Sequence, residues 1–271
     1  MAKLRKNRGF SLIEVLLSVG TLAVGMIFIA GVFPVAIHFA TVATEQTIAA
    51  VVADEAFAKI RIYAIGELDN PNDDIELNAL DTDELKPDDT TDFNDVFPAM
   101  KDATVNEFVY PSTAPGNAKQ YCWSALCRLT EGTLFDPNPP VQVTVFVCRR
   151  VSPQLVYRTP SGSDNSPRPI PVIVNVGRGS RNNELEIIES GKETYINDGC
   201  TIVDDRTGRL YRVLKRYPYP DDEMILLDRD WDYEDWDGGA SDPERRIWVV
   251  PPPVGGGKNP CIAIYQRVIR F

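Results

Sequence analysis

A long apolar stretch near the start of the chain contains very few polar positions. Between Phe10 and Ala43, Glu14 is the only acidic or basic residue, and His38 is the only histidine. As a helix at ~1.5 Å per residue, this stretch is about 50 Å long, which exceeds the ~30 Å hydrocarbon core of a bilayer. The pattern therefore predicts a helix that crosses a membrane and continues beyond it.

The following segment has a single apolar face. Its apolar residues recur at spacings of three and four, at Ala49, Val52, Ala53, Ala56, Phe57, Ile60 and Ala64. Glu55 and Lys59 are four residues apart, which favours an ion pair on the wetter side of a helix. Gly66 and Pro71 then provide stop signals. The two patterns together predict one helix over residues 10–65, membrane-spanning to about residue 43 and amphipathic after it.

A proline lies within the membrane half of this predicted helix. Pro34 has no N–H for the carbonyl of Ala30, so we expect a helix break or kink near residues 30–34. The alternative is that glycine and proline are simply commoner in membrane helices than in soluble ones. Both interpretations stay open on the sequence alone.

The remainder of the chain changes character twice. Residues 66–104 are rich in Asp, Asn, Thr and Pro and show no sustained period, which indicates an acidic, loop-rich segment. From about residue 105, runs rich in Val, Ile, Tyr and Trp predict β-strands. The predicted strands are 120–129, 141–149, 172–176, 200–203, 209–214, 223–227, 246–250 and 262–269.

The spacing of these strands predicts their arrangement. Asp205-Arg206-Thr207-Gly208 is a turn that joins two of them as a hairpin, and short connections of this kind imply antiparallel pairing. The apolar face of such a sheet needs cover, and the apolar stripe of residues 49–65 can provide it. The predicted fold is α+β, with one long N-terminal helix packed on an antiparallel β-sheet formed by a C-terminal domain over 105–271.

The charge of the chain argues against one class of partner. It has 28 Lys and Arg against 39 Asp and Glu, a formal net charge of −11. Four of the cations precede the apolar stretch, at Lys3, Arg5, Lys6 and Arg8, so the rest of the chain is near −15. Nucleic-acid phosphates are bound by Lys and Arg, so no nucleic-acid partner is predicted.

The junction between these cations and the apolar stretch has a specific pattern. The basic residues are followed by Gly9, Phe10, Ser11, Leu12, Ile13 and Glu14. This junction resembles the processing and methylation site of type IV prepilins and of the related pseudopilins of type II secretion. The family pattern is a basic leader, Gly, then Phe or Met, then Ser/Thr-Leu-Ile-Glu and an apolar helix.

The resemblance implies a pilin-like fold with a leader peptide over residues 1–9. In the family, a membrane aspartyl peptidase cuts after the Gly and methylates the new N-terminus. The cut is therefore expected between Gly9 and Phe10, with Phe10 as the methylated first residue. The implied partners are this prepilin peptidase, other pilin or pseudopilin subunits, an inner-membrane assembly platform and membrane lipid.

Glu14 matches the family's acid, fifth in the mature chain. A carboxylate within a membrane-length apolar segment costs about 2.5–3.5 kcal/mol on insertion scales, so it normally has a partner. The new amine of Phe10, at the positive end of the helix dipole, can neutralise it. If the amine of a neighbouring subunit does so, the pairing fixes the axial offset between subunits, and Glu14 is the assembly residue. The alternative is a tolerated acid that reaches water at the interface.

The leader also predicts topology. Basic residues stay cytoplasmic, which places the C-terminal domain outside the bacterial inner membrane on a single-pass anchor. The competing interpretation is a secretory signal peptide, but its apolar region would be only ~7–15 residues long. We therefore expect a periplasmic or extracytoplasmic domain that later joins a pilus or pseudopilus.

An exported chain with five cysteines can form two disulfides with one cysteine left over. If Leu129 faces Val141 across the first hairpin, the same antiparallel register sets Cys122 opposite Cys148. That pair is the predicted disulfide. The alternative is that all five cysteines are small buried apolar residues with reduced thiols.

The other three cysteines have no assigned partner. In the same register Cys127 faces Val143, and no local pattern supports a link between Cys200 and Cys261. No Cys-x-x-Cys motif occurs in the chain, so a zinc or redox site of that kind is not predicted.

An acidic run provides the one candidate for a cofactor. Asp228, Asp230 and Asp232 alternate along the chain, and alternating carboxylates can ligate calcium. The spacing fails the EF-hand pattern, however, so a solvated acidic loop is favoured and no metal or other cofactor is predicted. The chain has no Gly-x-Ser-x-Gly motif and its one histidine lies in the membrane segment, so an enzyme is not expected.

These observations favour a structural subunit. The expected function is a minor pilin or pseudopilin of a type IV pilus or a type II secretion pseudopilus, assembled through its N-terminal helix. The alternative is a membrane-anchored binding or adhesion module that does not polymerise, and an anchored periplasmic enzyme is a third class. Motility, adhesion, DNA uptake and protein secretion all stay open for the apparatus it would serve.

Overall fold

The structure is a computed structural model that describes most of the chain. The described residues are 11–64, 108–111, 120–129, 140–150, 152, 154–159, 162–164, 166–176, 181–205, 207–218, 221, 223–231 and 244–270. The expected leader, its cleavage position at Gly9 and Phe10, and the acidic segment 66–104 lie outside these residues. The fold is α+β, with one long N-terminal helix and antiparallel sheets.

The described chain begins with a single long helix, α1 (Leu12–Ala64), which lies within the predicted range of 10–65; residues 10 and 65 themselves lie outside the described residues. The chain divides into two compact units, Met1–Thr47 and Ile48–Phe271, and α1 contributes residues to both. The boundary lies close to the point where the sequence changes from apolar all round to amphipathic.

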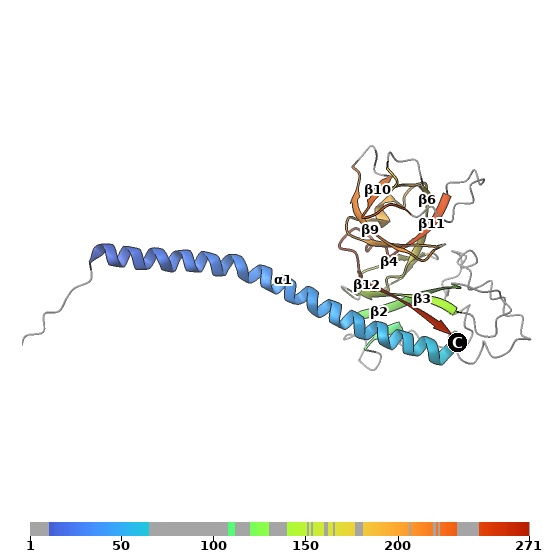
Figure 1. The fold of residues 1–271 in the computed structure, drawn as a ribbon, viewed down its shortest axis with the longest axis horizontal. Helices are drawn as coiled ribbons and strands as arrows, with labels where there is room; N and C mark the ends of the chain where they lie inside the picture. Colours follow the sequence, from blue (N-terminus) through green and yellow to red (C-terminus); the bar gives the residue numbers. More distant parts are fainter. Residues whose placement is uncertain are drawn as a thin grey trace, which may run out of the picture. The chain divides into compact units, whose positions relative to one another are not determined.

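The structure shows no break in the helix at Pro34, whereas a kink near residues 30–34 stays a prediction. The α-helix continues through Pro34 without interruption, and Figure 1 shows α1 as one unbroken coil. A proline removes one backbone hydrogen bond, here to the carbonyl of Ala30, but many bonds on either side remain in a helix of 53 residues. Loss of that single bond does not end the helix.

In the second unit the amphipathic part of α1 packs on a four-stranded antiparallel sheet. The strand order is β1-β2-β3-β12, so β3 and β12 are neighbours although they are far apart in sequence (Figure 1). The strands are β1 (Val109–Tyr110), β2 (Tyr121–Leu129), β3 (Pro140–Arg149) and β12 (Cys261–Arg270). The predicted sheet under the helix is therefore present, and its last strand comes from the C-terminal end of the chain.

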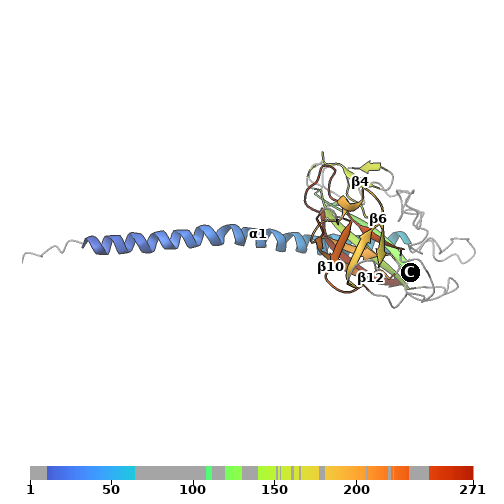
Figure 2. The same cartoon turned by 90° about the horizontal axis from the view of Figure 1, so that it is seen from above.

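Six of the strands between β3 and β12 close into a barrel. Its strand order is β10-β7-β6-β11-β8-β9, and every pair within it is antiparallel. Figure 2 shows barrel strands β6 and β10 from a second direction. The strands are β6 (Ile170–Val176), β7 (Glu184–Ile187), β8 (Thr201–Asp204), β9 (Leu210–Arg216), β10 (Met224–Leu227) and β11 (Glu244–Val249). A short hairpin of β4 (Tyr157–Thr159) and β5 (Gly162–Asp164) and a 3-10 turn at Glu193–Tyr195 complete the described elements.

The prediction of a single antiparallel β-sheet over residues 105–271 is therefore wrong in one respect. The predicted hairpin of β8 and β9 is present, but β11 pairs with β6 and β8 rather than with a sequence neighbour, and these pairings close the barrel. The barrel has its own apolar core. Its largest fully buried side chains are Leu185, Ile187, Ile196, Ile202, Tyr211 and Ile225.

The four-stranded sheet is covered on both faces. Arg267 of β12 contacts Asp54 of α1, and Arg267 is in register with Val143, so the Val143 face of the sheet lies toward the helix. The opposite face includes Thr144, whose hydroxyl oxygen accepts a hydrogen bond from the side-chain amide of Gln266 (3.0 Å). The amide of Gln266 also donates to the carbonyl of Gly208 (2.6 Å) in the β8–β9 turn, so this face lies toward the barrel. Strand β3 is accordingly buried from Val143 to Cys148.

Candidate functional site

The apolar half of α1, from Leu12 to Thr41, is the first candidate for function. Every residue from Ser11 to Thr41 is exposed in the structure, including large apolar side chains such as Phe28, Ile29 and Phe33. By length and composition the helix can cross a membrane. A helix that is apolar on all sides is normally surrounded by lipid or by other helices. The arrangement is therefore suited to a single-pass anchor.

Glu14 lies in the first turn of this helix. Its backbone N–H donates to the carbonyl of Ser11 (3.0 Å), as does that of Val15 (3.2 Å). The carbonyl of Glu14 accepts from the hydroxyl of Ser18 (2.7 Å), while the Glu14 side chain is exposed. The carboxylate therefore lies at the end of the helix where backbone N–H groups lack helical acceptors and negative charge is favoured.

The amphipathic half of α1 carries the predicted stripe. Ala49, Val52, Ala53, Ala56, Phe57 and Ile60 are each at most 2% exposed, in one cluster with the strands of the sheet. The predicted ion pair of Glu55 and Lys59 is present at 2.8 Å. This half of the helix is therefore part of the domain's core.

One contact of the helix was not visible in the sequence. The guanidinium of Arg267 donates to Asp54 (2.5 Å) and lies over the ring of Phe57, with its Cζ 4.6 Å from the ring centroid. Asp54 and Arg267 are 213 positions apart, so no local pattern could indicate the pair. The contact joins the exposed rim of the helix to β12 beside the buried ring of Phe57.

The cysteines lie partly as predicted. Cys122 is in register with Cys148, Leu129 with Val141, and Cys127 with Val143, so the predicted hairpin register is confirmed. The predicted disulfide is not formed, because Cys122, Cys148, Cys200 and Cys261 are free thiols. The backbone hydrogen-bonding pattern between β2 and β3 gives the physical reason. Arg150 N–H donates to the carbonyl of Gln120 (2.7 Å), which makes Cys122 and Cys148 a hydrogen-bonded pair, the type whose side chains are farther apart.

The acidic run at the end of β10 has a structural role in its described part. Asp228 accepts from the backbone N–H of Arg212 (3.0 Å) and lies 3.7 Å from Nε of Arg229. Asp230 is exposed, and Asp232 lies outside the described residues. Within the described parts of the chain, no group of three or more metal-binding side chains is placed to hold an ion.

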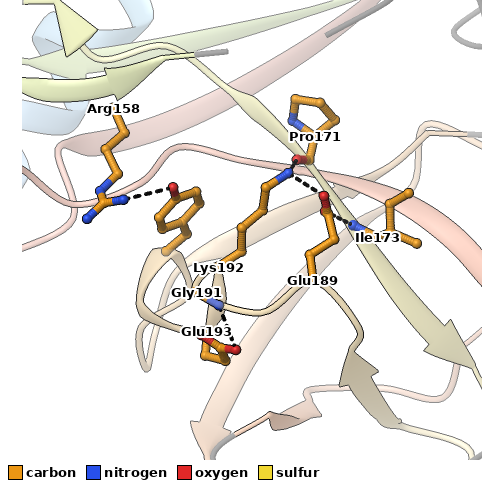
Figure 3. A network of polar contacts seen from close by, with 8 residues as sticks. Arg158, Pro171, Ile173, Glu189, Gly191, Lys192 and Glu193 are labelled. Carbon is orange, nitrogen blue, oxygen red and sulfur yellow. Dashed lines mark hydrogen bonds and ion pairs between the residues drawn. The ribbon is translucent and has the colours of Figure 1, made fainter. Parts of the chain in front are cut away.

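A polar network fastens the segment after β7 to β6 (Figure 3). Glu189 accepts from the backbone N–H of Ile173 (2.7 Å), and its second oxygen accepts from Nζ of Lys192 (2.7 Å). Lys192 also donates to the carbonyl of Pro171 (3.0 Å). The Glu189 side chain thus continues the hydrogen bonding of β6 beyond the end of β7, a role that spacing in the sequence does not reveal.

A second polar contact joins β11 to the β8–β9 turn within the barrel. The indole N–H of Trp248 donates to the carboxylate of Asp205 (2.5 Å), a residue that is 5% exposed. Nη1 of Arg246 lies 3.8 Å from the other oxygen of the same carboxylate. Trp248 belongs to the same apolar cluster as the helix stripe and β3. The contact therefore satisfies a carboxylate that would be costly to bury alone.

Comparisons with known proteins leave the family open. No protein-family model, no curated protein and no solved structure matches the chain.

Proposed function

We propose that this protein is a minor pilin or pseudopilin. It would be processed between Gly9 and Phe10 by a prepilin peptidase, anchored in the bacterial inner membrane with its domain outside, and assembled with related subunits on an inner-membrane platform. The apparatus would be a type IV pilus or a type II secretion pseudopilus.

The observation that carries the proposal is the nature of α1. It is one continuous helix that begins with Glu14 in its first turn, exposes apolar side chains on all sides to Thr41, and then buries one stripe in its own domain. An anchor needs only the apolar length. A carboxylate in its first turn adds a charge within the membrane that a neighbouring subunit's amine can neutralise, and this gives docking a fixed register.

Mass spectrometry of the protein from its native membrane tests the processing step. The mature chain is expected to begin at Phe10 and to carry one added methyl group. A chain that still begins at Met1, or one trimmed beyond His38, would contradict the proposal.

Substitution of Glu14 tests assembly. Glu14→Ala is expected to insert into the membrane at the normal level but to fail to enter filaments, because the register-setting charge is absent. Glu45→Ala is the matched control, since it removes an acid from the same helix beyond the apolar stretch, and it should assemble normally. Equal assembly of both variants and the wild type would overturn the proposal.

A second candidate function rests on the barrel. A six-stranded barrel is present in addition to the helix and the sheet that covers it. An anchored domain of this size could serve as a binding or adhesion module that never polymerises. In that case Glu14→Ala would leave surface binding intact, and the wild type would be absent from filaments.

A further inference from the structure

Three cysteines lie side by side on three neighbouring strands. Cys148 of β3 is in register with Cys122 of β2 on one side and with Cys261 of β12 on the other. Residues opposite one another in a sheet project from the same face, so all three side chains share one face. Interactions with the thiols of Cys122 and Cys261, followed by burial, raise the pKa of the Cys148 thiol well above its ordinary value.

This face is the one that lies toward the barrel. Thr144 is on the barrel side, as its contact with Gln266 and the turn at Gly208 requires. Side chains alternate along a strand, so Cys148, four residues after Thr144 in the same strand, is on the same side. The three thiols therefore lie between the sheet and the barrel.

The two possible cysteine pairs differ in backbone geometry. Arg150 N–H bonds to β2 at Gln120, whereas Arg149 N–H bonds to Pro260 (2.8 Å), at the start of β12. Since backbone N–H and C=O groups alternate between the two edges of a strand, the N–H and C=O of Cys148 are directed toward β2. Cys148 and Cys122 thus form a hydrogen-bonded pair, while Cys148 and Cys261 form a non-hydrogen-bonded pair, in which opposing side chains lie closer.

The two pairs also differ in access from solvent. Cys261 is partly exposed, whereas Cys122 is 3% exposed and Cys148 is fully buried. The Cys122 thiol is directed to the carbonyl of Cys148 (3.8 Å). An external disulfide can therefore reach Cys261 first, and the thiol next to it in the closer pair is Cys148.

We propose that Cys148 and Cys261 are a site of disulfide formation, supplied by exchange with an external small-molecule or protein disulfide. The Cys261 thiolate attacks one sulfur of that disulfide and releases one thiol. The Cys148 thiolate then attacks Cys261 Sγ and releases the second thiol. Two cysteine thiols are oxidised to one disulfide, one external disulfide is reduced to two thiols, and both protons leave with the departing thiols.

The link has a defined structural effect. The chain between β3 and β12 carries the whole barrel, so the disulfide closes a loop around it and fixes the edge strand β12 at the point where the chain returns to the sheet. Cys122 remains a thiol. Formation of this disulfide in the cell rests on the proposed extracytoplasmic location. The placement of the three thiols in the fold does not depend on that location.

Peptide mapping of the purified full chain in detergent tests the site. The protein is incubated with oxidised glutathione, its remaining thiols are blocked with iodoacetamide, and peptides are analysed by mass spectrometry without reduction. The expected product joins the Cys148 and Cys261 peptides. Its rate should rise with pH, because the raised pKa of Cys148 keeps its thiolate scarce at neutral pH. A dominant link between Cys122 and Cys148, or no link at all, overturns the proposal.

Matched substitutions separate the three thiols. Cys122→Ser is expected to leave the link between Cys148 and Cys261 unchanged, and so is Cys200→Ser, which removes a buried thiol of the barrel. Cys261→Ser should slow disulfide formation at Cys148 at least tenfold. If Cys122→Ser and Cys261→Ser slowed disulfide formation at Cys148 equally, the assignment of the pair would be overturned. If a variant fails to fold, the peptide map of the wild type still shows which two cysteines are linked.

Comparison with protein from cells separates this inference from the proposed function. Failure of the purified protein to form the link overturns the inference and leaves the proposed function standing. A purified protein that links readily, but is fully reduced when isolated with its thiols trapped, would instead contradict the extracytoplasmic location.

Discussion

Replacing Phe57 by alanine tests whether α1 is an integral part of the domain core. Phe57 is 2% exposed and lies in the same cluster as Trp123 and Trp248. Burial of a phenylalanine side chain stabilises by about 1.5–3 kcal/mol, and the cavity left by its loss raises the cost of Phe→Ala to about 3–5 kcal/mol. For a domain of this size, each kcal/mol lowers Tm by about 2–4 °C, so the expected fall is about 6–20 °C.

Two variants at nearby positions calibrate this value. Val51 is on the same helix but 49% exposed, so Val51→Ala should change stability by no more than about 0.5 kcal/mol. Arg267 stacks on the Phe57 ring, but its side chain is 51% exposed and that of Asp54 is 63% exposed. An exposed ion pair and an exposed cation–π contact each contribute about 1 kcal/mol or less, so Arg267→Ala should cost far less than Phe57→Ala.

Urea unfolding of the full chain in detergent, followed by tryptophan fluorescence, measures these differences. The buried Trp123 and Trp248 report directly on the cluster that contains Phe57. The midpoint for Phe57→Ala should fall while the slope of the transition stays the same. A cost below about 1 kcal/mol, or one equal to that of Val51→Ala, would refute the reasoning, because a side chain so fully enclosed cannot be removed from a packed core at that cost.

Three further substitutions test the barrel. Gly208 has φ +67° in the β8–β9 turn, so Gly208→Ala should cost about 1–2 kcal/mol in urea unfolding and Gly208→Asn clearly less; equal costs would contradict the conformational explanation. Burial raises the pKa of Cys200 from 9.0 to about 12, so the folded protein retains this proton longer than the unfolded chain. The protonated Cys200 thiol therefore contributes fully to the stability of the folded state below pH 9, and this contribution is lost as the pH rises toward 12. The decline of Tm between pH 9 and 12 should be smaller in Cys200→Ala than in the wild type. An identical decline would be evidence against the raised pKa of Cys200. Glu189→Ala removes the acceptor for the N–H of Ile173 and should lower the free energy of unfolding by about 1–3 kcal/mol, measured from urea midpoints. Glu189→Gln retains an acceptor oxygen and should cost less. An unchanged free energy of unfolding in Glu189→Ala would be inconsistent with the network.

Local patterns predicted the individual elements well. Each of the eight predicted strands is present, and so are the helix stripe and the ion pair of Glu55 and Lys59. These features depend on residues a few positions apart, which the sequence displays directly. The strands that were missed are short: β1 has 2 residues, β4 and β5 have 3 each, and β7 has 4. Two to four residues do not establish a period of two.

Long-range pairing could not be predicted in the same way. The barrel closes because β11 pairs with β6 and β8, and β12 reaches the sheet only by pairing with β3. Neither pairing follows from turn residues, because the partners are separated by other strands. The contact of Asp54 with Arg267 depends on the same topology. The disulfide prediction shows the limit within a hairpin: the register of Cys122 and Cys148 was correct, but their hydrogen-bonding phase, which sets side-chain separation, was not visible.

One pattern in the sequence does reflect the insertion of the barrel. A sheet with one face in water has alternating apolar and polar residues, whereas a strand covered on both faces is apolar at nearly every position. Strand β3 contains the run Val145-Phe146-Val147-Cys148, all buried, and the helix can cover only the face of Val145 and Val147. The face of Phe146 and Cys148 needs the barrel. The barrel is therefore required to complete the core, and its removal would expose Phe146 and the row of three thiols to solvent.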